Sequence, residues 1–228
     1  MEGIMKSLTL TDFLSSPRTD EFIESAQPFF KLMMQYQCAM LEIQTKFQVL
    51  NTEMSIDRDH KSIESISCRL KQPRSIVEKL KRRNIDITLN NIESELHDVA
   101  GVRVICSFPD DIYKLAEKIC SQDDVTLIEK KDYIAFPKPN GYRSLHLILE
   151  IPVFFANETK RMKVEVQLRT IAMDFWASIE HKVRYKKEIN APKHILDDLK
   201  KCADQIYKLD LHMQKISQQI EQYNMNKK

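Results

Sequence analysis

The middle of the chain holds four short segments in which apolar and polar residues alternate, and this pattern constrains the fold more than any other feature. The segments are VRVICSF, VTLIEKKDYI, SLHLILEI and MKVEVQLR, at residues 102–108, 125–134, 144–151 and 162–169. Segments of this length that are rich in β-branched residues and have a two-residue period are typical of half-buried strands. Residues 110–121, between the first two segments, have helical spacing instead. The pattern predicts an α/β or α+β sheet domain.

Helices are predicted on both sides of these segments, beginning at Pro28, at Pro73, after Thr170 and at Pro192. The first is a long amphipathic helix, because its apolar residues recur at alternating steps of four and three. Residues 66–71 alternate like a further strand. Residues 1–27 are weakly patterned and stay unassigned.

The last helix has the most regular pattern in the chain. Over about four heptads its apolar positions keep a strict alternation of four and three, at Ile195, Leu199, Cys202, Ile206, Leu209, Met213, Ile216, Ile220 and Tyr223. A stripe this narrow favours a seam between helices over a helix that lies on its own sheet, which needs a wider stripe. The partner of the seam is the N-terminal helix, another subunit, or both.

Charge and cysteine content exclude several classes of protein. The chain has 35 basic and 33 acidic side chains, so neither a generic nucleic-acid coat nor a strongly acidic surface is expected. The five cysteines show no metal-ligand spacing, and their odd number argues against a disulfide framework; we expect small buried apolar side chains in a reducing compartment. No apolar stretch approaches the roughly 20 residues needed to cross a bilayer. We therefore expect a soluble, cytoplasmic protein without a membrane partner.

A cluster of cations lies before the alternating segments. The segment RLKQPRSIVEKLKRR, residues 69–83, holds seven basic residues and one acid. Such a cluster is often only the solvated face of a helix. Here, however, Arg69 and Lys71 share one face of the expected strand, and Lys79 lies on the helix that follows, so several cations can converge on one cleft. A polyphosphate is the ligand that such convergence suits.

Two acids are candidates for binding Mg²⁺. Asp98 precedes a strand entered through Gly101, where a rigid strand fixes an accessible side chain, although a simple turn aspartate would occupy the same place. Glu165 lies on the polar face of the segment MKVEVQLR. Mg²⁺ prefers one or two carboxylates together with ligand phosphates. His97 beside Asp98 suggests a metal-dependent hydrolase, but no second set of His or Asp ligands accompanies it, so that interpretation is rejected.

The segment PKPNGYRSLHL, residues 137–147, has the features of a binding loop. Gly141 is one of three glycines in the chain and marks a turn, since glycine tolerates left-handed backbone. Tyr142 after it offers an aromatic face to a base. The alternation of the two flanking strands would direct His146 and Glu165 into the same groove, although a lone histidine is more often structural.

Several longer motifs resemble those of a known family. DVAGVRV, KDYIAFPKPNGYRSLHL, VEVQLRT and MDFWASIEHKVRYK are similar to the synthetase domain of the RelA/SpoT alarmone synthetases, and RLKQPRSIVEKLKRR resembles that family's donor-nucleotide segment. The resemblance runs from about residue 60 to 187 and keeps the motifs in order. It leaves no room for the hydrolase and regulatory domains of the long enzymes, so the chain resembles the small stand-alone synthetases of the RelQ and RelP type.

The resemblance implies a fold and a division into regions. The fold would be α+β, with a mixed, largely antiparallel central sheet flanked by helices, as in nucleotidyltransferase-like synthetases, and with long N- and C-terminal helices. Residues 28–58 would form an N-terminal helical region, residues 59–187 the alarmone synthetase domain, and residues 188–228 a C-terminal oligomerisation helix. Residues 1–27 lie outside the resemblance.

The resemblance also implies an activity, that of a Mg²⁺-dependent GTP/GDP 3′-pyrophosphokinase. The enzyme would move the β,γ-pyrophosphate of ATP to the 3′-hydroxyl of GDP, GTP or GMP, and so make (p)ppGpp and AMP for the stringent response. By similarity, ATP would be bound by Arg69, Lys71, Ser75, Lys79, Arg82 and Arg103, and the guanine nucleotide by Lys138, Asn140, Tyr142 and His146. Asp98 and Glu165 would hold Mg²⁺, and Glu165 would also act as the base on the attacking hydroxyl.

The partners implied by the resemblance are other copies of the chain and nucleotides. Small members of the family form homotetramers through their terminal helices, in agreement with the C-terminal seam. Some also bind single-stranded RNA or an alarmone at an allosteric cleft, and no feature of the sequence decides either point. Two alternatives stay open: a catalytically inactive, oligomeric RNA- or nucleotide-binding regulator of the same fold, and a nucleotidyltransferase that releases pyrophosphate instead of AMP.

Overall fold

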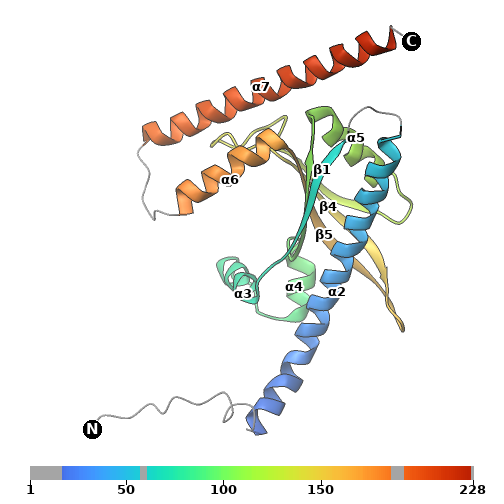
Figure 1. Cartoon of the computed structure of the whole chain (residues 1–228). Coiled ribbons are helices and arrows are strands. Elements are labelled where there is room, and N and C mark those ends of the chain that lie inside the picture. Colours follow the sequence, from blue (N-terminus) through green and yellow to red (C-terminus); the bar gives the residue numbers. More distant parts are fainter. Residues whose placement is uncertain (1–16, 57–60, 186–192, 227–228) are drawn as a thin grey trace.

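The structure is built around one five-stranded sheet, with a long helix before it and another after it (Figure 1). The computed structural model describes residues 17–56, 61–185 and 193–226. The strands lie in the order β1-β2-β5-β4-β3; β2 and β5 run parallel, and the other neighbouring pairs run antiparallel. This arrangement confirms the predicted α+β class and the mixed, largely antiparallel sheet. The strands are β1 (Ile63–Leu70), β2 (Ala100–Cys106), β3 (Thr126–Asp132), β4 (Leu145–Phe154) and β5 (Thr159–Thr170).

The two-residue period of the strands separates an apolar face of the sheet from a polar one. On β5, the apolar residues that alternate with Glu165 have at most 2% of their surface exposed; they are Met162, Val164, Val166 and Leu168. The helices α2 (Pro17–Met54) and α5 (Pro109–Cys120) cover this face and share one core with it. Apolar burial is the dominant favourable term in folding, so these helices pack on the apolar face. The opposite, polar face is left available for ligands.

The remaining helices are α3 (Pro73–Arg82), α4 (Leu89–Glu95), α6 (Ile171–Tyr185) and α7 (Lys193–Met225). The structure begins α3 and α6 where the sequence predicts them, whereas Pro192, the predicted start of α7, lies outside the described residues. The short α4 was not predicted, because its seven residues are too few to show a helical period. Within the described parts of the chain, none of these helices is both long and apolar enough to span a membrane.

The predicted start of the first helix at Pro28 is wrong. The structure begins α2 at Pro17 and places Pro28 inside the helix. Proline has no N–H and therefore removes one hydrogen bond to the carbonyl four residues earlier. The neighbouring side chains of Gln27 and Phe30 are exposed, so water can reach the freed carbonyl, and the helix continues through the proline at reduced cost.

The prediction of five buried cysteines holds only in part. All five are free thiols, and Cys106 is buried. Cys38 and Cys120 are half-buried, while Cys68 and Cys202 are exposed. The two exposed cysteines have a structural reason, because Cys68 lies on the edge strand β1 and Cys202 lies on the exposed side of α7.

The last helix, α7, docks on α6 and α5 rather than along α2 (Figure 1). The indole nitrogen of Trp176 donates a hydrogen bond to the carbonyl of Leu199 at 3.0 Å, and the Thr170 hydroxyl donates one to Asp210 at 2.6 Å. Burial raises the pKa of Asp210, and the bond from Thr170 offsets part of that rise. Besides these polar contacts, two residues of the predicted seam, Leu199 and Ile206, pack against Trp176, Ala177 and Ala203, so the domain covers the first part of the seam.

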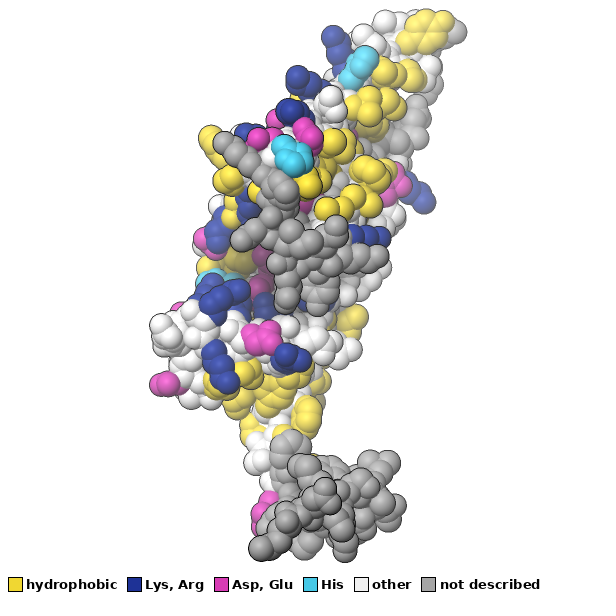
Figure 2. All heavy atoms as spheres, turned by 90° about the vertical axis from the view of Figure 1, so that its left-hand side faces the viewer, with side chains coloured by type: hydrophobic (Ala, Val, Ile, Leu, Met, Phe, Trp, Pro, Cys, Tyr) yellow, Lys and Arg dark blue, Asp and Glu magenta, His cyan; other side chains and the backbone are white. Residues whose placement is uncertain are grey.

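The part of the predicted seam from Leu209 onward faces outward. Four of its residues, Leu209, Met213, Ile220 and Tyr223, have between 52% and 61% of their surface exposed. Figure 2 shows hydrophobic side chains gathered along the upper part of the molecule, where Figure 1 places α7. Of the partners that the sequence left open, the N-terminal helix therefore does not cover this stripe.

Gly141 is required by both its backbone angle and its surroundings. Its φ is +90°, in the region that favours glycine. An added Cβ would lie 2.6 Å from the Cβ of Ala203 and 3.4 Å from the Cα of Lys200, both on α7. The turn therefore packs directly against α7, a reason for glycine that the sequence alone did not reveal.

We predict that Gly141→Ala lowers the free energy of unfolding by about 2 kcal/mol, because it combines positive-φ strain with overpacking against α7. The measurement is urea denaturation followed by circular dichroism. Gly101→Ala is the matched control, since its Cβ would meet only the Arg69 carbonyl at 3.5 Å, and it should stay within about 1 kcal/mol of wild type. Equal losses in the two variants would contradict the packing argument.

Candidate active site

The register of the sheet gathers polar residues of four strands on the face that α2 and α5 leave free. Strand β2 lies between β1 and β5, and β4 follows β5. Residues paired directly across neighbouring strands project to the same face. Two adjacent rows result, one made by Arg69, Gly101 and Glu165, and the other by Ser67, Arg103, Gln167 and His146.

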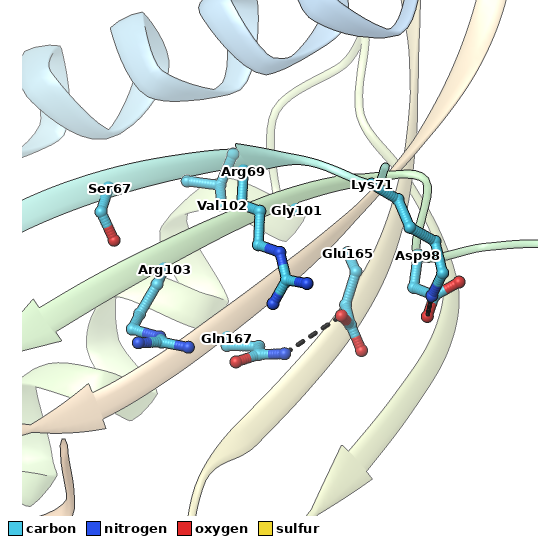
Figure 3. Close-up of a pocket in the computed structure, with 9 residues that line it drawn as sticks. All are labelled: Ser67, Arg69, Lys71, Asp98, Gly101, Val102, Arg103, Glu165 and Gln167. Carbon is cyan, nitrogen blue, oxygen red and sulfur yellow. Dashed lines mark hydrogen bonds and ion pairs between the residues drawn. The ribbon is translucent and has the colours of Figure 1, made fainter. Parts of the chain in front are cut away.

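These rows form the floor of a cavity of about 440 Å³, a size that suits a nucleotide-sized ligand. Figure 3 shows the side chains of Arg69, Arg103, Glu165 and Gln167 directed into it, with Asp98 and Lys71 at one end. The full lining is Ser67, Arg69, Lys71, Asp98, Gly101, Val102, Arg103, Glu165 and Gln167. The cavity thus combines two acids with several cations.

Gly101 leaves the centre of the cavity open. It pairs with Arg69 on one side and with Glu165 on the other. A Cβ at this position would make only an ordinary contact with the protein, so steric crowding does not require glycine. The missing side chain instead gives a ligand access to the backbone between a cation and an acid.

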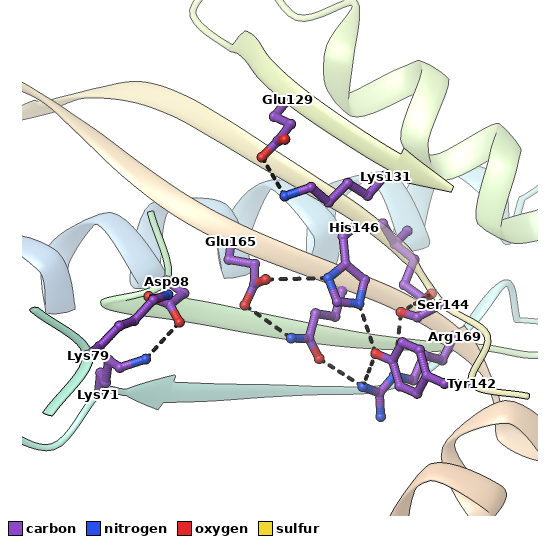
Figure 4. Close-up of polar contacts among 12 residues, drawn as sticks. Lys71, Lys79, Asp98, Glu129, Lys131, Tyr142, Ser144, His146, Glu165 and Arg169 are labelled. Carbon is purple, nitrogen blue, oxygen red and sulfur yellow. Dashed lines mark hydrogen bonds and ion pairs between the residues drawn. The ribbon is translucent and has the colours of Figure 1, made fainter. Parts of the chain in front are cut away.

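Asp98 lies in the turn before β2 and is held by two lysines (Figure 4). Lys71 Nζ is 2.7 Å from Oδ2, and Lys79 Nζ is 2.7 Å from Oδ1. Burial raises the pKa of Asp98, but the hydrogen bonds and charges of the two ammonium groups more than offset it, so the pKa falls below its usual value. The carboxylate is therefore ionised at neutral pH, and Lys71 of the strand end and Lys79 of α3 converge on it.

Glu165 projects from the middle of β5 and contacts two neighbours. Its Oε1 is 3.4 Å from Nδ1 of His146, and its Oε2 accepts a hydrogen bond of 3.1 Å from the side-chain amide of Gln167. Burial and, more weakly, Asp98 raise the pKa of Glu165, but His146 and Gln167 outweigh them, and the pKa is lowered. The influence of Asp98 also shows that the two candidate metal ligands are electrostatic neighbours.

The contacts of Glu165 belong to a closed ring of hydrogen bonds (Figure 4). The Tyr142 hydroxyl lies 2.8 Å from Nε2 of His146 and accepts a 2.6 Å bond from Arg169. Arg169 also donates to the side-chain carbonyl of Gln167 at 3.0 Å. The ring runs from Glu165 through His146, Tyr142, Arg169 and Gln167 back to Glu165, so it links the cavity to the tyrosine of the binding loop.

The binding loop predicted from the sequence lies beside the cavity; we call residues 133–144 the acceptor loop. Lys138 Nζ lies 4.9 Å from the centre of the Tyr142 ring, a cation–π distance. The side-chain oxygen of Asn140 accepts a hydrogen bond from the Tyr142 backbone N–H, and its amide donates to Glu180 of α6. The structure thus groups Lys138, Asn140 and Tyr142 with His146, as the resemblance implies, although no contact shown here assigns them a ligand.

Of the residues expected to bind ATP, some lie at the cavity and others do not. Arg69, Lys71 and Arg103 line the cavity, and Lys79 reaches it through Asp98. Burial and then the nearby Arg169 guanidinium lower the pKa of Arg103, and Arg69 adds to this effect. Ser75 is half-buried on the first turn of α3, and Arg82 is exposed on its last turn; neither lines the cavity.

The two acids of the cavity suit a magnesium ion whose other ligands are water and substrate phosphates. Within the described residues, no group of three or more His, Cys, Asp or Glu side chains could hold a metal by itself. Asp98 and Glu165 supply two carboxylates on one cavity wall. Mg²⁺ commonly takes one or two carboxylates and completes its shell with water and substrate phosphates, so this pair suits a metal that enters with a nucleotide.

Sequence reasoning missed three polar residues of the site, namely Ser67, Gln167 and Arg169. Gln167 and Arg169 share the polar face of β5 with Glu165, so the alternation placed them correctly without indicating a role. Arg169 is 5% exposed, and a buried arginine that is fully hydrogen-bonded usually has a specific structural task. Ser67 lies two residues before Arg69 on β1, so the alternation likewise placed it on the face of Arg69 without indicating a role.

The comparisons with known proteins agree with this site. A family model described as a region found in RelA / SpoT proteins matches residues 68–190. GTP pyrophosphokinase YwaC of Bacillus subtilis is 40% identical over 208 residues, which are 91% of this chain and 99% of that protein. The crystal structure of small alarmone synthetase 2 from Bacillus subtilis has a TM-score of 0.76 at 41% identity and covers 84% of this chain and 98% of that one.

A further solved structure contains a nucleotide. It is small alarmone synthetase 1 from Bacillus subtilis bound to its product pppGpp, with a TM-score of 0.76 at 34% identity, and the match covers 85% of this chain and 98% of that one. The family model spans more than half of the chain, and the similarity to these proteins extends over nearly all of it. The chain therefore belongs to the RelA/SpoT family, and within it resembles the small alarmone synthetases.

Proposed function

We propose that this protein is a GTP pyrophosphokinase, which transfers the β,γ-pyrophosphate of ATP to the 3′-hydroxyl of GDP or GTP and releases AMP. Its product is (p)ppGpp, the alarmone of the stringent response. The names of the similar proteins and the pppGpp bound to one of them support the proposal. The observation on this chain that carries it is the single cavity in which Asp98 and Glu165 lie among Arg69, Lys71 and Arg103.

The reaction leaves little covalent work to the protein. The 3′-oxygen of the acceptor forms a bond to the β-phosphorus of ATP, and the bond from that phosphorus to the α,β-bridging oxygen breaks as AMP leaves. The proton of the hydroxyl passes to a carboxylate. Alignment of the two nucleotides and neutralisation of phosphate charge therefore supply most of the rate.

On the donor side, the cations of the cavity bind the triphosphate. Lys71 and Lys79 exchange the Asp98 carboxylate for phosphate oxygens, and the guanidinium planes of Arg69 and Arg103 stack on the adenine. Asp98 and Glu165 would hold Mg²⁺, which would supply charge neutralisation at the ATP phosphates. Ser75 and Arg82 of α3 would reach ATP only at its outer edge, outside the cavity lining.

On the acceptor side, Tyr142 stacks on the guanine. Lys138 lies over the Tyr142 ring, so a stacked base displaces the ammonium, which then meets the acceptor phosphates. Asn140 holds the backbone of Tyr142, and His146 contacts the ribose or its phosphates from β4. In this arrangement the acceptor ribose lies next to Glu165, because His146 contacts that carboxylate directly.

Glu165 is the proposed general base. Its lowered pKa keeps it ionised at neutral pH, which a proton acceptor requires. The contact with His146 is one cause of the lowering, so a turn of His146 toward the acceptor would raise the basicity of Glu165 when the substrate is present. General-base assistance of this kind is typically worth about 10² to 10⁴ in rate.

The assembly and its compartment are further parts of the proposal. Residues 59–187 serve as the synthetase domain, and residues 188–228 serve as the helix that joins subunits into a homotetramer, supported by the exposed apolar stripe of α7. The free thiols are compatible with a reducing cytoplasm. Binding of single-stranded RNA or of an alarmone at a cleft between subunits stays a prediction.

We predict that the purified protein with Mg²⁺ and labelled ATP converts GDP, GTP or GMP into a 3′-pyrophosphorylated product and an equal amount of AMP. Thin-layer chromatography of the labelled nucleotides measures both. Glu165→Gln is the matched control: it keeps the shape of the side chain, should still bind nucleotides, and should lose about 10² to 10⁴ in turnover. Release of pyrophosphate instead of AMP would indicate a nucleotidyltransferase, and binding without turnover a regulator.

We predict that Asp98→Asn removes the effect of Mg²⁺ on binding of a non-hydrolysable ATP analogue. In wild type Mg²⁺ should tighten this binding, whereas in the variant it should not. Without Mg²⁺ the variant should bind the analogue at least as tightly as wild type, because Lys71 and Lys79 no longer pair with the carboxylate. Isothermal titration calorimetry gives both affinities independently of turnover. An unchanged Mg²⁺ effect would remove Asp98 from the metal site.

We predict that the double variant Leu209→Glu, Ile216→Glu breaks the assembly, because it places charges in the apolar stripe of α7. Analytical ultracentrifugation should show an oligomer for wild type and a smaller species for the variant. Lys208→Glu is the control, since Lys208 is exposed on α7 outside the stripe. A wild-type protein that sediments as a monomer at all concentrations would refute the seam.

A further inference from the structure

Arg143 ties the two ends of the acceptor loop to each other and to α7. Its Nη1 donates a 3.1 Å hydrogen bond to the carbonyl of Ile134, near the start of the loop, although Arg143 itself is near the end. Its Nη2 lies 3.0 Å from Oδ1 of Asp204, and its guanidinium carbon lies 4.1 Å from the centre of the Tyr207 ring. Both partners belong to α7. One side chain therefore makes three different contacts.

The charge of Arg143 is well enclosed. The side chain of Arg143 is 12% exposed and that of Asp204 is 46% exposed, so the arginine is enclosed while water reaches the carboxylate. A guanidinium suits this position better than an ammonium, because its planar fork can serve a carbonyl and a carboxylate at once and stack on an aromatic ring. Arg143 is thus a fixed part of the structure and not a free surface cation.

The rest of the acceptor loop also rests on α7 and on its neighbour α6. Gly141 approaches Ala203 so closely that it has no room for a Cβ. Tyr142 packs against a small cluster of Trp176, Ala177 and Ala203, to which Leu199 and Ile206 also belong. The loop that carries the proposed acceptor residues therefore rests on α6 and α7, while the sheet supplies its two ends and holds the Tyr142 hydroxyl through His146 and Arg169.

The donor side of the cavity depends less directly on α7. Its residues come from β1, from α3, from β2 and from the turn before β2, whereas α7 packs mainly on α5 and α6 and bonds to Thr170 at the end of β5. The link from α7 to the donor side runs through α6, whose Asp174 lies 3.5 Å from Arg103. A change in how the acceptor loop sits on α7 should consequently alter binding of the guanine nucleotide and leave binding of ATP as it is. A positioning role of the loop can therefore be measured as a change in affinity for the guanine nucleotide without a change in affinity for ATP.

We propose that Arg143 is a positioning residue for the guanine nucleotide: by pairing with Asp204 and stacking on Tyr207, it anchors the acceptor loop to α7 and holds Tyr142 ready to stack on the base. The inference rests on the proposed function, because it takes a guanine nucleotide as the acceptor. Arg143 touches neither nucleotide in this scheme and acts through the loop. The affinity for the guanine nucleotide then depends on how the acceptor loop packs on α7.

The test compares Arg143→Ala, Asp204→Asn and the double variant with wild type. We expect each to raise KM for GDP by about tenfold, the effect of a misplaced binding group, while KM for ATP stays within about twofold and kcat at saturating GDP is retained. Because the two residues act through one contact, the double variant should lose no more than the worse single variant. Calorimetry with GDP alone and with a non-hydrolysable ATP analogue alone should show the same asymmetry.

Two further variants sharpen the result. Asp198→Asn removes an exposed ion pair of α7 with Lys201 that does not touch the loop, and it should leave both KM values unchanged. Arg143→Lys keeps the charge but not the fork, and should recover part of the GDP affinity that Arg143→Ala loses. A residue with a purely structural role would not produce this graded, acceptor-specific response.

Three outcomes would overturn the inference. Equal increases in both KM values together with a lower Tm would mean that Arg143 only stabilises the fold. A loss in Arg143→Ala without a loss in Asp204→Asn would mean that the arginine meets the nucleotide directly. Unchanged GDP affinity in all variants would mean that the loop needs no anchor.

Failure of the proposed function can be recognised separately. If wild type makes no (p)ppGpp, the proposed function fails, but the GDP affinities measured by calorimetry still decide the role of Arg143. If wild type binds no GDP, both the proposed function and the inference fail.

Discussion

The register between β2 and β5 is the constraint on which the site depends. It places Gly101 beside Glu165 and Arg103 beside Gln167. A slip of one residue would turn Glu165 into the core and bring apolar side chains of β5 to the cavity, because successive side chains of a strand face opposite sides. Burial of the apolar face under α2 opposes that slip. The hydrophobic core therefore determines which side chains reach the cavity, as well as stabilising the fold.

The charges of the site are arranged so that each acid has a cationic or hydrogen-bonding neighbour. Asp98 is paired with Lys71 and Lys79, and Glu165 contacts His146. A half-buried carboxylate without such partners would become protonated, since burial disfavours its charged form. The same lysines are the groups that a triphosphate attracts. In the proposed mechanism these lysines would move to phosphate and leave the Asp98 carboxylate free for Mg²⁺, so the contacts that stabilise the protein alone would also prepare the site for a nucleotide with its metal.

Local patterns in the sequence were enough to predict the strands and the polar face that carries Glu165, because a two-residue period reports directly on which side of a sheet is buried. They left the class open between α/β and α+β, and the mixed, largely antiparallel sheet was predicted from the family resemblance. The grouping of Asp98 with the cations of the basic segment came from the family resemblance, since Lys71 and Asp98 lie 27 residues apart. The role of Arg143 followed from neither, since its partner Asp204 lies 61 residues away and no local period links the two. The start of α2 was predicted incorrectly for a related reason: proline is a local signal for a helix start, and here the surrounding helix overrides it.

The architecture places the two proposed nucleotide sites on opposite sides of one strand. The residues proposed for the donor come from β1, α3 and β2 on one side of β5, and those proposed for the acceptor come from β4 and from the acceptor loop on the other. Glu165 lies on β5, between the two groups. The acceptor group alone leans on α7, whose outward stripe is the surface proposed for assembly. In the proposed scheme, a helix that joins subunits on one face and supports a substrate loop on another would connect assembly with the choice of acceptor, because a shift of α7 would disturb the packing of Gly141 and Tyr142.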